Sequence, residues 1–181
     1  MKIINGPNLN ILGTREPGIY GLGKLNAQGS NFGITAGFHS LSLKMDYLSM
    51  TESESGQGFF VGVTSDFSLS DKFSLQPQLQ FATSSQDGDS IEQLILPIML
   101  KYHVTEKFNL QAGPQLDYLL GDSEGLNAIG FGLGFGAGFD FSEKIFISTR
   151  YALGLSNRLE DAPSEISLKL NTFQIGLGYR F

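Results

Sequence analysis

Apolar and polar residues alternate along most of the chain from Asn31 onward, and this period of two is its dominant pattern. It is clearest over residues 73–81, FSLQPQLQF, where every odd position is apolar and every even position is serine or glutamine. Such alternation is typical of a β-strand with one apolar and one polar face. The predicted strands are 31–43, 59–69, 73–81, 94–103, 108–118, 129–141, 145–155 and 173–181.

The connections between these strands are of two kinds. Short polar turns with the sequences SDK, TEK and SEK occur at 70–72, 105–107 and 142–144. Longer, polar and mostly acidic segments lie between the other strands, near 46–57, 83–90, 120–128 and 156–167. Alternating short and long connections predict an up-and-down antiparallel arrangement, with short turns on one rim and long loops on the other. Both ends of the strand region then lie on the short-turn rim.

Eight such strands predict an all-β fold, a closed antiparallel β-barrel. A soluble ligand-binding barrel would point its apolar face inward, whereas a transmembrane barrel points that face to lipid. The polar face favours the membrane, because it carries glycine, serine and glutamine with few of the charges of a soluble surface. Small residues also suit the narrow interior of eight strands. The last strand ends at Phe181 in an alternating aromatic pattern that resembles an outer-membrane insertion signal.

Charged residues on the polar face are the next candidates for a function. They are Asp66, Lys101, Asp117, Asp140, Arg150 and Arg180. We interpret them as charge pairs that fill the barrel interior, because an unpaired buried charge is costly, rather than as a path for protons or a ligand. His39 and His103 share this face without neighbours at metal-ligand spacing, so we expect neither a metal nor a cofactor.

Net charge restricts the possible partners. The chain has a formal net charge of −6 and no basic stripe, which argues against nucleic acid as a partner. The predicted partners are outer-membrane lipid and an extracellular ligand or surface bound by the four acidic loops.

Residues 29–181 resemble the small outer-membrane β-barrel proteins of Gram-negative bacteria, the OmpX-like group of the porin family. The segments that carry the resemblance are SDKFSLQPQLQF, EKFNLQAGPQL and the closing IGLGYRF. The resemblance implies an outer-membrane location and a non-enzymatic, structural or surface-interaction role. It does not imply a channel, because eight strands enclose no open pore.

The N-terminal residues 1–21, MKIINGPNLNILGTREPGIYG, resemble a different family, the type II 3-dehydroquinate dehydratases. The motifs NGPNLN, LG, REP and YG match in order and spacing. The resemblance implies that Tyr20 is the proton acceptor, that Arg15 stabilises the transition state, and that Asn8 lies in the substrate site. It provides the alternative function, a cytoplasmic lyase that converts 3-dehydroquinate to 3-dehydroshikimate in the shikimate pathway.

This second resemblance stops at Gly21. Residues 22–181 show none of the α/β alternation of that family, and neither histidine lies in a matching context. Residues 25–29, LNAQG, resemble the end and cleavage site of a signal peptide. We therefore predict two units: residues 1–28, a dehydroquinase-like fragment with a signal-peptide remnant that neither folds alone nor catalyses, and residues 29–181, the barrel.

Overall fold

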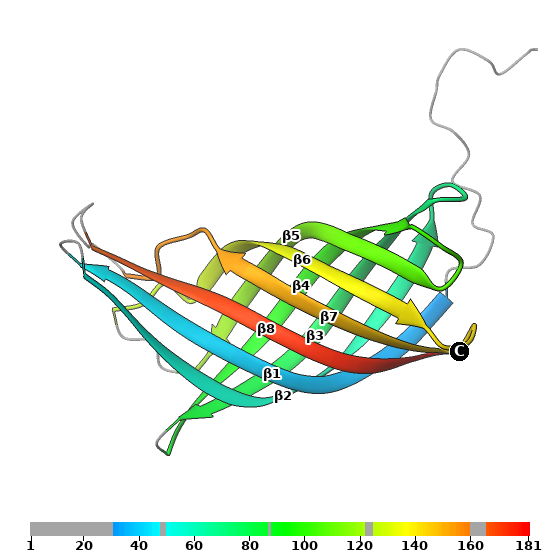
Figure 1. Cartoon of the computed structure of the whole chain (residues 1–181). Helices are drawn as coiled ribbons and strands as arrows, with labels where there is room; N and C mark the ends of the chain where they lie inside the picture. The colour runs from blue at the N-terminus through cyan, green and yellow to red at the C-terminus, as the bar shows by residue number, and fades with distance from the viewer. Residues whose placement is uncertain (1–30, 48–49, 87, 122–124, 160–165) are drawn as a thin grey trace, which may run out of the picture.

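The computed structural model describes residues 31–47, 50–86, 88–121, 125–159 and 166–181. These residues form eight strands that surround a common axis (Figure 1). The strands are β1 (Asn31–Tyr47), β2 (Met50–Ser68), β3 (Phe73–Gln86), β4 (Asp89–His103), β5 (Phe108–Leu120), β6 (Ile129–Asp140), β7 (Ile145–Gly154) and β8 (Ile166–Arg180).

The sheet is a closed barrel in which each strand pairs antiparallel with its sequence neighbours. β8 closes the barrel by pairing with β1, from Gly33 opposite Arg180 to Tyr47 opposite Ile166. The backbone N–H of Phe181 donates to the carbonyl of Phe32 at 2.9 Å, so the start of β1 and the end of the chain lie at the same rim. The predicted up-and-down barrel is confirmed.

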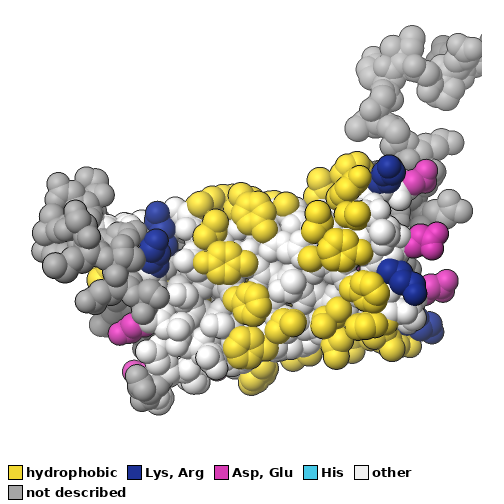
Figure 2. All heavy atoms as spheres, in the orientation of Figure 1, with side chains coloured by type: hydrophobic (Ala, Val, Ile, Leu, Met, Phe, Trp, Pro, Cys, Tyr) yellow, Lys and Arg dark blue, Asp and Glu magenta, His cyan; other side chains and the backbone are white. Residues whose placement is uncertain are grey.

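The apolar face of every strand points out of the barrel. On β3, Leu79 is 51% exposed whereas its neighbour Gln80 is 1% exposed. A band of hydrophobic side chains covers the middle of the outer wall, and the charged side chains gather toward the two ends (Figure 2). The soluble barrel considered above requires apolar residues inside, so that alternative is wrong.

The described part of the chain contains no helix long and apolar enough to cross a membrane.

The three short turns share one local geometry. The hydroxyl of Ser70 accepts a hydrogen bond from the N–H of Phe73 at 3.1 Å. Thr105 and Ser142 accept in the same way from the residues three positions later, at 2.9 and 3.1 Å. A serine or threonine at the first turn position supplies this local acceptor. The recurrence of SDK, TEK and SEK therefore reflects one repeated turn.

Aromatic rings gather at the rim that carries the short turns. Phe73 and Tyr102 have ring centroids 5.2 Å apart across β3 and β4. Phe139 packs edge-on against Phe141 at 5.3 Å, and Tyr179 against Phe181 at 5.8 Å. Aromatic girdles of this kind mark the membrane interface of outer-membrane barrels.

Two of the four predicted long loops are wrong. β1 and β2 pair as far as Tyr47 opposite Met50, and β3 and β4 as far as Gln86 opposite Asp89, so most of 46–57 and 83–90 is strand. The alternation of apolar and polar residues is lost in these two segments, because neither face of a strand must be apolar once the strand has left the lipid. A tight connection then suffices, and Gly88 takes a left-handed conformation with φ of 100°.

The other two long connections are present, over residues 121–128 and 155–165. They meet at an isolated bridge between Leu126 and Leu159. β8 begins at Ile166, earlier than the predicted 173.

The barrel is therefore taller on one side. A tilted strand of about 9–11 residues crosses a bilayer, whereas β1 has 17 residues and β2 has 19. β6 and β7, on the opposite side, have 12 and 10 residues. The long strands extend beyond the others at the rim opposite the short turns, which we call the long-connection rim (Figure 1).

Leu79→Arg tests the lipid-facing side of the wall. We expect the free energy of unfolding to fall by about 2–4 kcal/mol, because the charge enters the middle of the apolar band. Leu69→Arg is the matched control at the short-turn rim and should cost about 0–1 kcal/mol. Urea unfolding in lipid vesicles measures both variants, and equal losses would contradict the assignment.

Candidate functional site in the barrel interior

A cluster of four charged residues lies inside the barrel near the short-turn rim. Asp66 on β2 accepts from Lys101 on β4 at 3.0 Å and from Arg180 on β8 at 3.3 Å. Arg180 also pairs with Asp140 on β6 at 2.6 Å. The Lys101 side chain is only 2% exposed. For these four residues, the predicted charge pairing inside the barrel is confirmed.

Phe146 on β7 lies against this cluster. Its ring is 3% exposed, with the guanidinium carbon of Arg180 4.4 Å and the ammonium nitrogen of Lys101 5.7 Å from the ring centroid. A Cβ atom at Gly178 would collide with this ring, so the glycine provides the space for it. Cations over an aromatic face are stabilised by its quadrupole. Sequence reasoning missed Phe146, because it is an aromatic residue at a position where the pattern calls for a small or polar one.

Arg150 on β7 lies deeper in the barrel and pairs with amides instead of a carboxylate. Its guanidinium donates to the side-chain oxygens of Gln78 at 3.3 Å, Gln80 at 2.9 Å and Gln174. The prediction of a charge pair is thus wrong for Arg150. Carbonyl oxygens of three glutamines can replace a carboxylate because together they present several partial negative charges to one planar donor group.

The glutamines of β3 connect Arg150 to the charged cluster. The amide N–H of Gln80 donates to Gln78 at 2.6 Å, and that of Gln78 donates to Gln76 at 2.8 Å. Gln76 in turn donates to Asp66 at 2.9 Å. Along this chain every amide oxygen points toward Arg150 and every amide N–H points toward Asp66. The hydrogen bonds therefore polarise one another in the same direction. The alternating QPQLQ sequence is what places these three amides on one face.

A further ion pair lies toward the long-connection rim. Asp117 on β5 pairs with Arg158 of the 155–165 connection. Arg158 is 1% exposed and also donates to the carbonyls of Asn127 at 2.9 Å and Ala128 at 3.0 Å. Burial lowers the pKa of Arg158 to about 10, which still leaves it charged at neutral pH. Sequence reasoning missed this partner, because Arg158 lies outside the alternating segments and the polar face already held equal numbers of the two signs.

Apolar side chains occupy the interior beyond these polar groups. Leu41, Leu119 and Leu170 form a buried cluster, with Leu43 and Ile91 packed against it. Phe60, Ile95 and Ala82 form a second cluster. The interior of the described barrel is therefore a packed core of ion pairs, amides and apolar groups.

His39 is buried in this core, and His103 is half-buried at the end of β4. Nδ1 of His39 lies 3.2 Å from the amide nitrogen of Gln174, and Nε2 of His103 lies 2.9 Å from the hydroxyl of Ser74. Across the described ranges, no group of three or more histidine, cysteine, aspartate or glutamate side chains could hold a metal ion.

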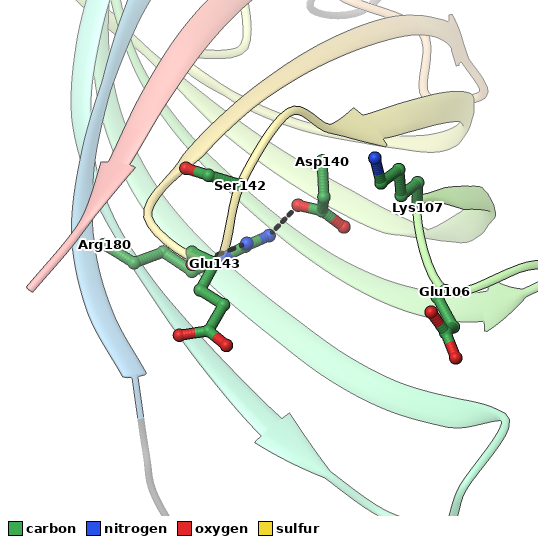
Figure 3. Close-up of a pocket in the computed structure, with 6 residues that line it drawn as sticks. All are labelled: Glu106, Lys107, Asp140, Ser142, Glu143 and Arg180. Carbon is green, nitrogen blue, oxygen red and sulfur yellow. Dashed lines mark hydrogen bonds and ion pairs between the residues drawn. The ribbon is translucent and has the colours of Figure 1, made fainter.

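A pocket of about 430 Å³ opens at the short-turn rim, beside Asp140 and Arg180 of the charged cluster (Figure 3). Lys107, Asp140 and Arg180 line it, together with Glu106, Ser142 and Glu143 from the turns. Figure 3 shows Arg180 extending across this pocket to Asp140. The resemblance to the dehydratases gave three candidate catalytic residues, Asn8, Arg15 and Tyr20. They lie outside the described residues, as does the whole segment 1–28.

A family model matches most of the chain. The model, described as "Outer membrane protein beta-barrel domain", matches residues 20–181. It includes all eight strands and every interior residue discussed above.

Solved structures show the same fold. The crystal structure of Ail, the attachment invasion locus protein of Yersinia pestis, has a TM-score of 0.53 and 15% identity, over 84% of this chain and 99% of Ail. Neisserial surface protein A has a TM-score of 0.53 and 12% identity, over 83% of this chain and 97% of that protein. At this identity, the similarity is evidence for the fold alone.

Curated relatives match a short stretch only. The 3-dehydroquinate dehydratase of Azorhizobium caulinodans is 54% identical over 43 residues, which are 24% of this chain and 29% of that enzyme. The 3-dehydroquinate dehydratase 1 of Pseudomonas aeruginosa is 49% identical over 47 residues, 24% of this chain and 32% of that enzyme. The chain thus spans less than a third of the length of these relatives.

Asp66→Asn tests the interior charge cluster. The change leaves Lys101 and Arg180 without their shared carboxylate, and breaking a buried pair in this way costs about 3–5 kcal/mol. We expect the free energy of unfolding in urea to fall by that amount, measured by far-ultraviolet circular dichroism in lipid vesicles. Asp71→Asn, in an exposed turn, is the control and should change it by less than about 0.5 kcal/mol. A cluster without energetic importance would give two indistinguishable variants.

Proposed function

The chain belongs to the outer membrane protein β-barrel domain family, and from this premise we propose that it is a non-enzymatic surface-interaction protein. It lies in the outer membrane. In the proposal, the long-connection rim faces the outside and contacts extracellular partners, while the barrel wall contacts lipid. Longer connections on the outer side are the usual arrangement in bacterial barrels.

The observation that carries this proposal is the length of β1 to β4 at the long-connection rim. These strands pair past the height that a membrane crossing requires, as far as Tyr47 opposite Met50 and Gln86 opposite Asp89. Paired strands hold their ends more rigidly than a free loop does. A rigid projecting surface loses less conformational entropy when a partner binds it.

The packed interior supports a role at the surface rather than transport through the barrel. Arg150 and its three glutamine partners are buried in the barrel interior. The ion pairs of Asp66 and Asp117 lie on either side of it along the interior. Passage of a solute would require these groups to separate, and each separation would leave buried charge unpaired.

The charge of the rim indicates the kind of partner. The sequence of the connections carries acidic residues with Arg158 as the basic exception, and Arg158 is already paired with Asp117. The paired ends of β1 and β8 add two lysines, Lys44 and Lys169, which the acidic residues of this rim outnumber. An acidic surface accelerates and orients the approach of a positively charged one. The proposed partner is therefore a surface or polypeptide rich in lysine and arginine.

A 3-dehydroquinate dehydratase is the second candidate, and the short match to these enzymes supports it. Catalysis by Asn8, Arg15 and Tyr20 would need a scaffold that holds the reacting groups to within a fraction of an ångström. The described residues supply a barrel with a packed interior instead. We therefore favour the non-enzymatic role.

Binding to an immobilised decalysine peptide tests the surface role. The protein, in nanodiscs of zwitterionic lipid, should bind this peptide less tightly as salt increases. Replacing the acidic residues of the two long connections by their amides should weaken binding several-fold. Those residues are Asp122, Glu124, Glu160, Asp161 and Glu165.

Glu106→Gln with Glu143→Gln provides the control for that experiment. Both glutamates lie at the short-turn rim and are exposed, so we expect their replacement to leave binding unchanged. Binding that depends on the short-turn rim, or on neither rim, would contradict the proposal.

The purified, folded chain should not dehydrate 3-dehydroquinate above the rate in buffer, as followed by the ultraviolet absorbance of the conjugated product. Turnover that is lost in Tyr20→Phe but retained in Tyr102→Phe would instead establish the enzymatic alternative. Tyr102 serves as the control because it lies on the outer wall.

A further inference from the structure

A cavity of about 270 Å³ lies inside the projecting end of the barrel, between β1, β2, β3 and β4. It is separate from the ion pairs and from the pocket at the short-turn rim. Its apolar lining consists of Leu41 and Ile91, with Leu43 nearer the entrance, and all three belong to or pack against the buried leucine cluster. This lining therefore offers a surface on which an apolar group would be removed from water.

Gly56 creates the space. It lies on β2 opposite Leu41 of β1 and is buried in the cavity wall. A Cβ atom at Gly56 would lie 3.3 Å from Cβ of Ser84, so any larger side chain at position 56 would grow into the cavity.

Ser84 on β3 presents an unsatisfied polar atom in this cavity. The residue is 3% exposed and its hydroxyl has no hydrogen-bond partner. Several other buried polar atoms of the described barrel also lack a partner, but among these residues only Ser84 lines this cavity. A bound group that exchanges a hydrogen bond with the hydroxyl would provide that partner.

Two carboxylates stand at the entrance. Glu54 lies on β2 opposite Leu43, and Asp89 lies on β4 opposite Gln86. Both are exposed. Asp117 on the neighbouring β5 is already paired with Arg158. The entrance therefore favours a positive charge next to an apolar lining.

We propose that this cavity binds a small amphipathic cation, an ammonium group attached to an aromatic or short alkyl body. The ammonium group lies between Glu54 and Asp89 and donates to Ser84, and the apolar body packs on Leu41, Leu43 and Ile91. A bare metal ion fits poorly, because only two carboxylates line the cavity and the described residues contain no group of three metal-ligating side chains. The proposal rests on the proposed function, since it takes this rim as the one that faces the outside.

Phenethylammonium is the probe, added to the ¹⁵N-labelled protein in zwitterionic nanodiscs. We expect saturable changes in the amide resonances of Gly56 and Ser84. 2-Phenylethanol, which has a similar shape without the charge, should bind at least tenfold more weakly, and Mg²⁺ should not reproduce the changes. Saturation by 2-phenylethanol at equal concentration, or by Mg²⁺ alone, would overturn the proposed ligand chemistry.

Two variants test the site itself. Gly56→Leu fills the cavity and should abolish the saturable changes. Glu54→Gln with Asp89→Asn alters exposed side chains only, so the barrel should still fold, and we expect affinity to fall at least tenfold. Glu106→Gln at the opposite rim should have no effect. Unchanged affinity in the amide double variant, or no saturable binding by the folded wild-type protein, would overturn the proposal.

The phenethylammonium test can fail while the decalysine test of the surface role succeeds. Decalysine carries ten ammonium groups, of which the cavity can hold at most one, so Gly56→Leu should weaken its binding far less than replacement of the acidic residues of the two long connections does. If the folded wild-type protein binds decalysine but not phenethylammonium, the result counts against the cavity alone.

Discussion

Closure of the sheet is the constraint on which the rest of the structure depends. Backbone N–H and C=O groups that face hydrocarbon find no water, so a membrane-spanning sheet must pair its first strand with its last. β1 and β8 do this over their whole common length, from Gly33 opposite Arg180 to Tyr47 opposite Ile166. Closure by eight strands then gives a narrow interior, and the alternation of side chains gives one face to lipid and the other to that interior.

In the narrow interior, large side chains lie next to glycines, which leave room for them. Phe146 occupies the space that a side chain at Gly178 would need, and Arg158 occupies that of Gly130. A chain of hydrogen bonds crosses this interior, since the three glutamines of β3 link the cation of Arg150 to the carboxylate of Asp66. A packed and connected interior makes the barrel a rigid support for its long-connection rim.

The alternation of apolar and polar residues predicted the membrane-spanning strands and which side chains point inward. It could not predict the strand ends beyond the lipid or the partners of the interior side chains. The strands within the lipid were predictable because every second residue must be apolar, as FSLQPQLQF shows. Beyond the lipid both faces can be polar, so the continuation of β1 into β2 was mistaken for a loop. The inward position of Asp66 was predictable, but its partners were not, because pairing depends on which strands lie opposite one another across the barrel. For the same reason the amide partners of Arg150 and the role of Arg158 became visible only in three dimensions.

The central claim is that the barrel has an apolar outer wall in lipid and a polar, packed interior. The chain contains no cysteine, so single cysteines carrying a spin label can be placed one at a time at positions 73–81 of β3. Collision of the label with molecular oxygen, which concentrates in lipid, measures which positions face the bilayer. We expect high oxygen accessibility at odd positions and low accessibility at even positions, with a period of two across the whole series. A uniform profile, or maxima at the glutamine positions, would contradict it.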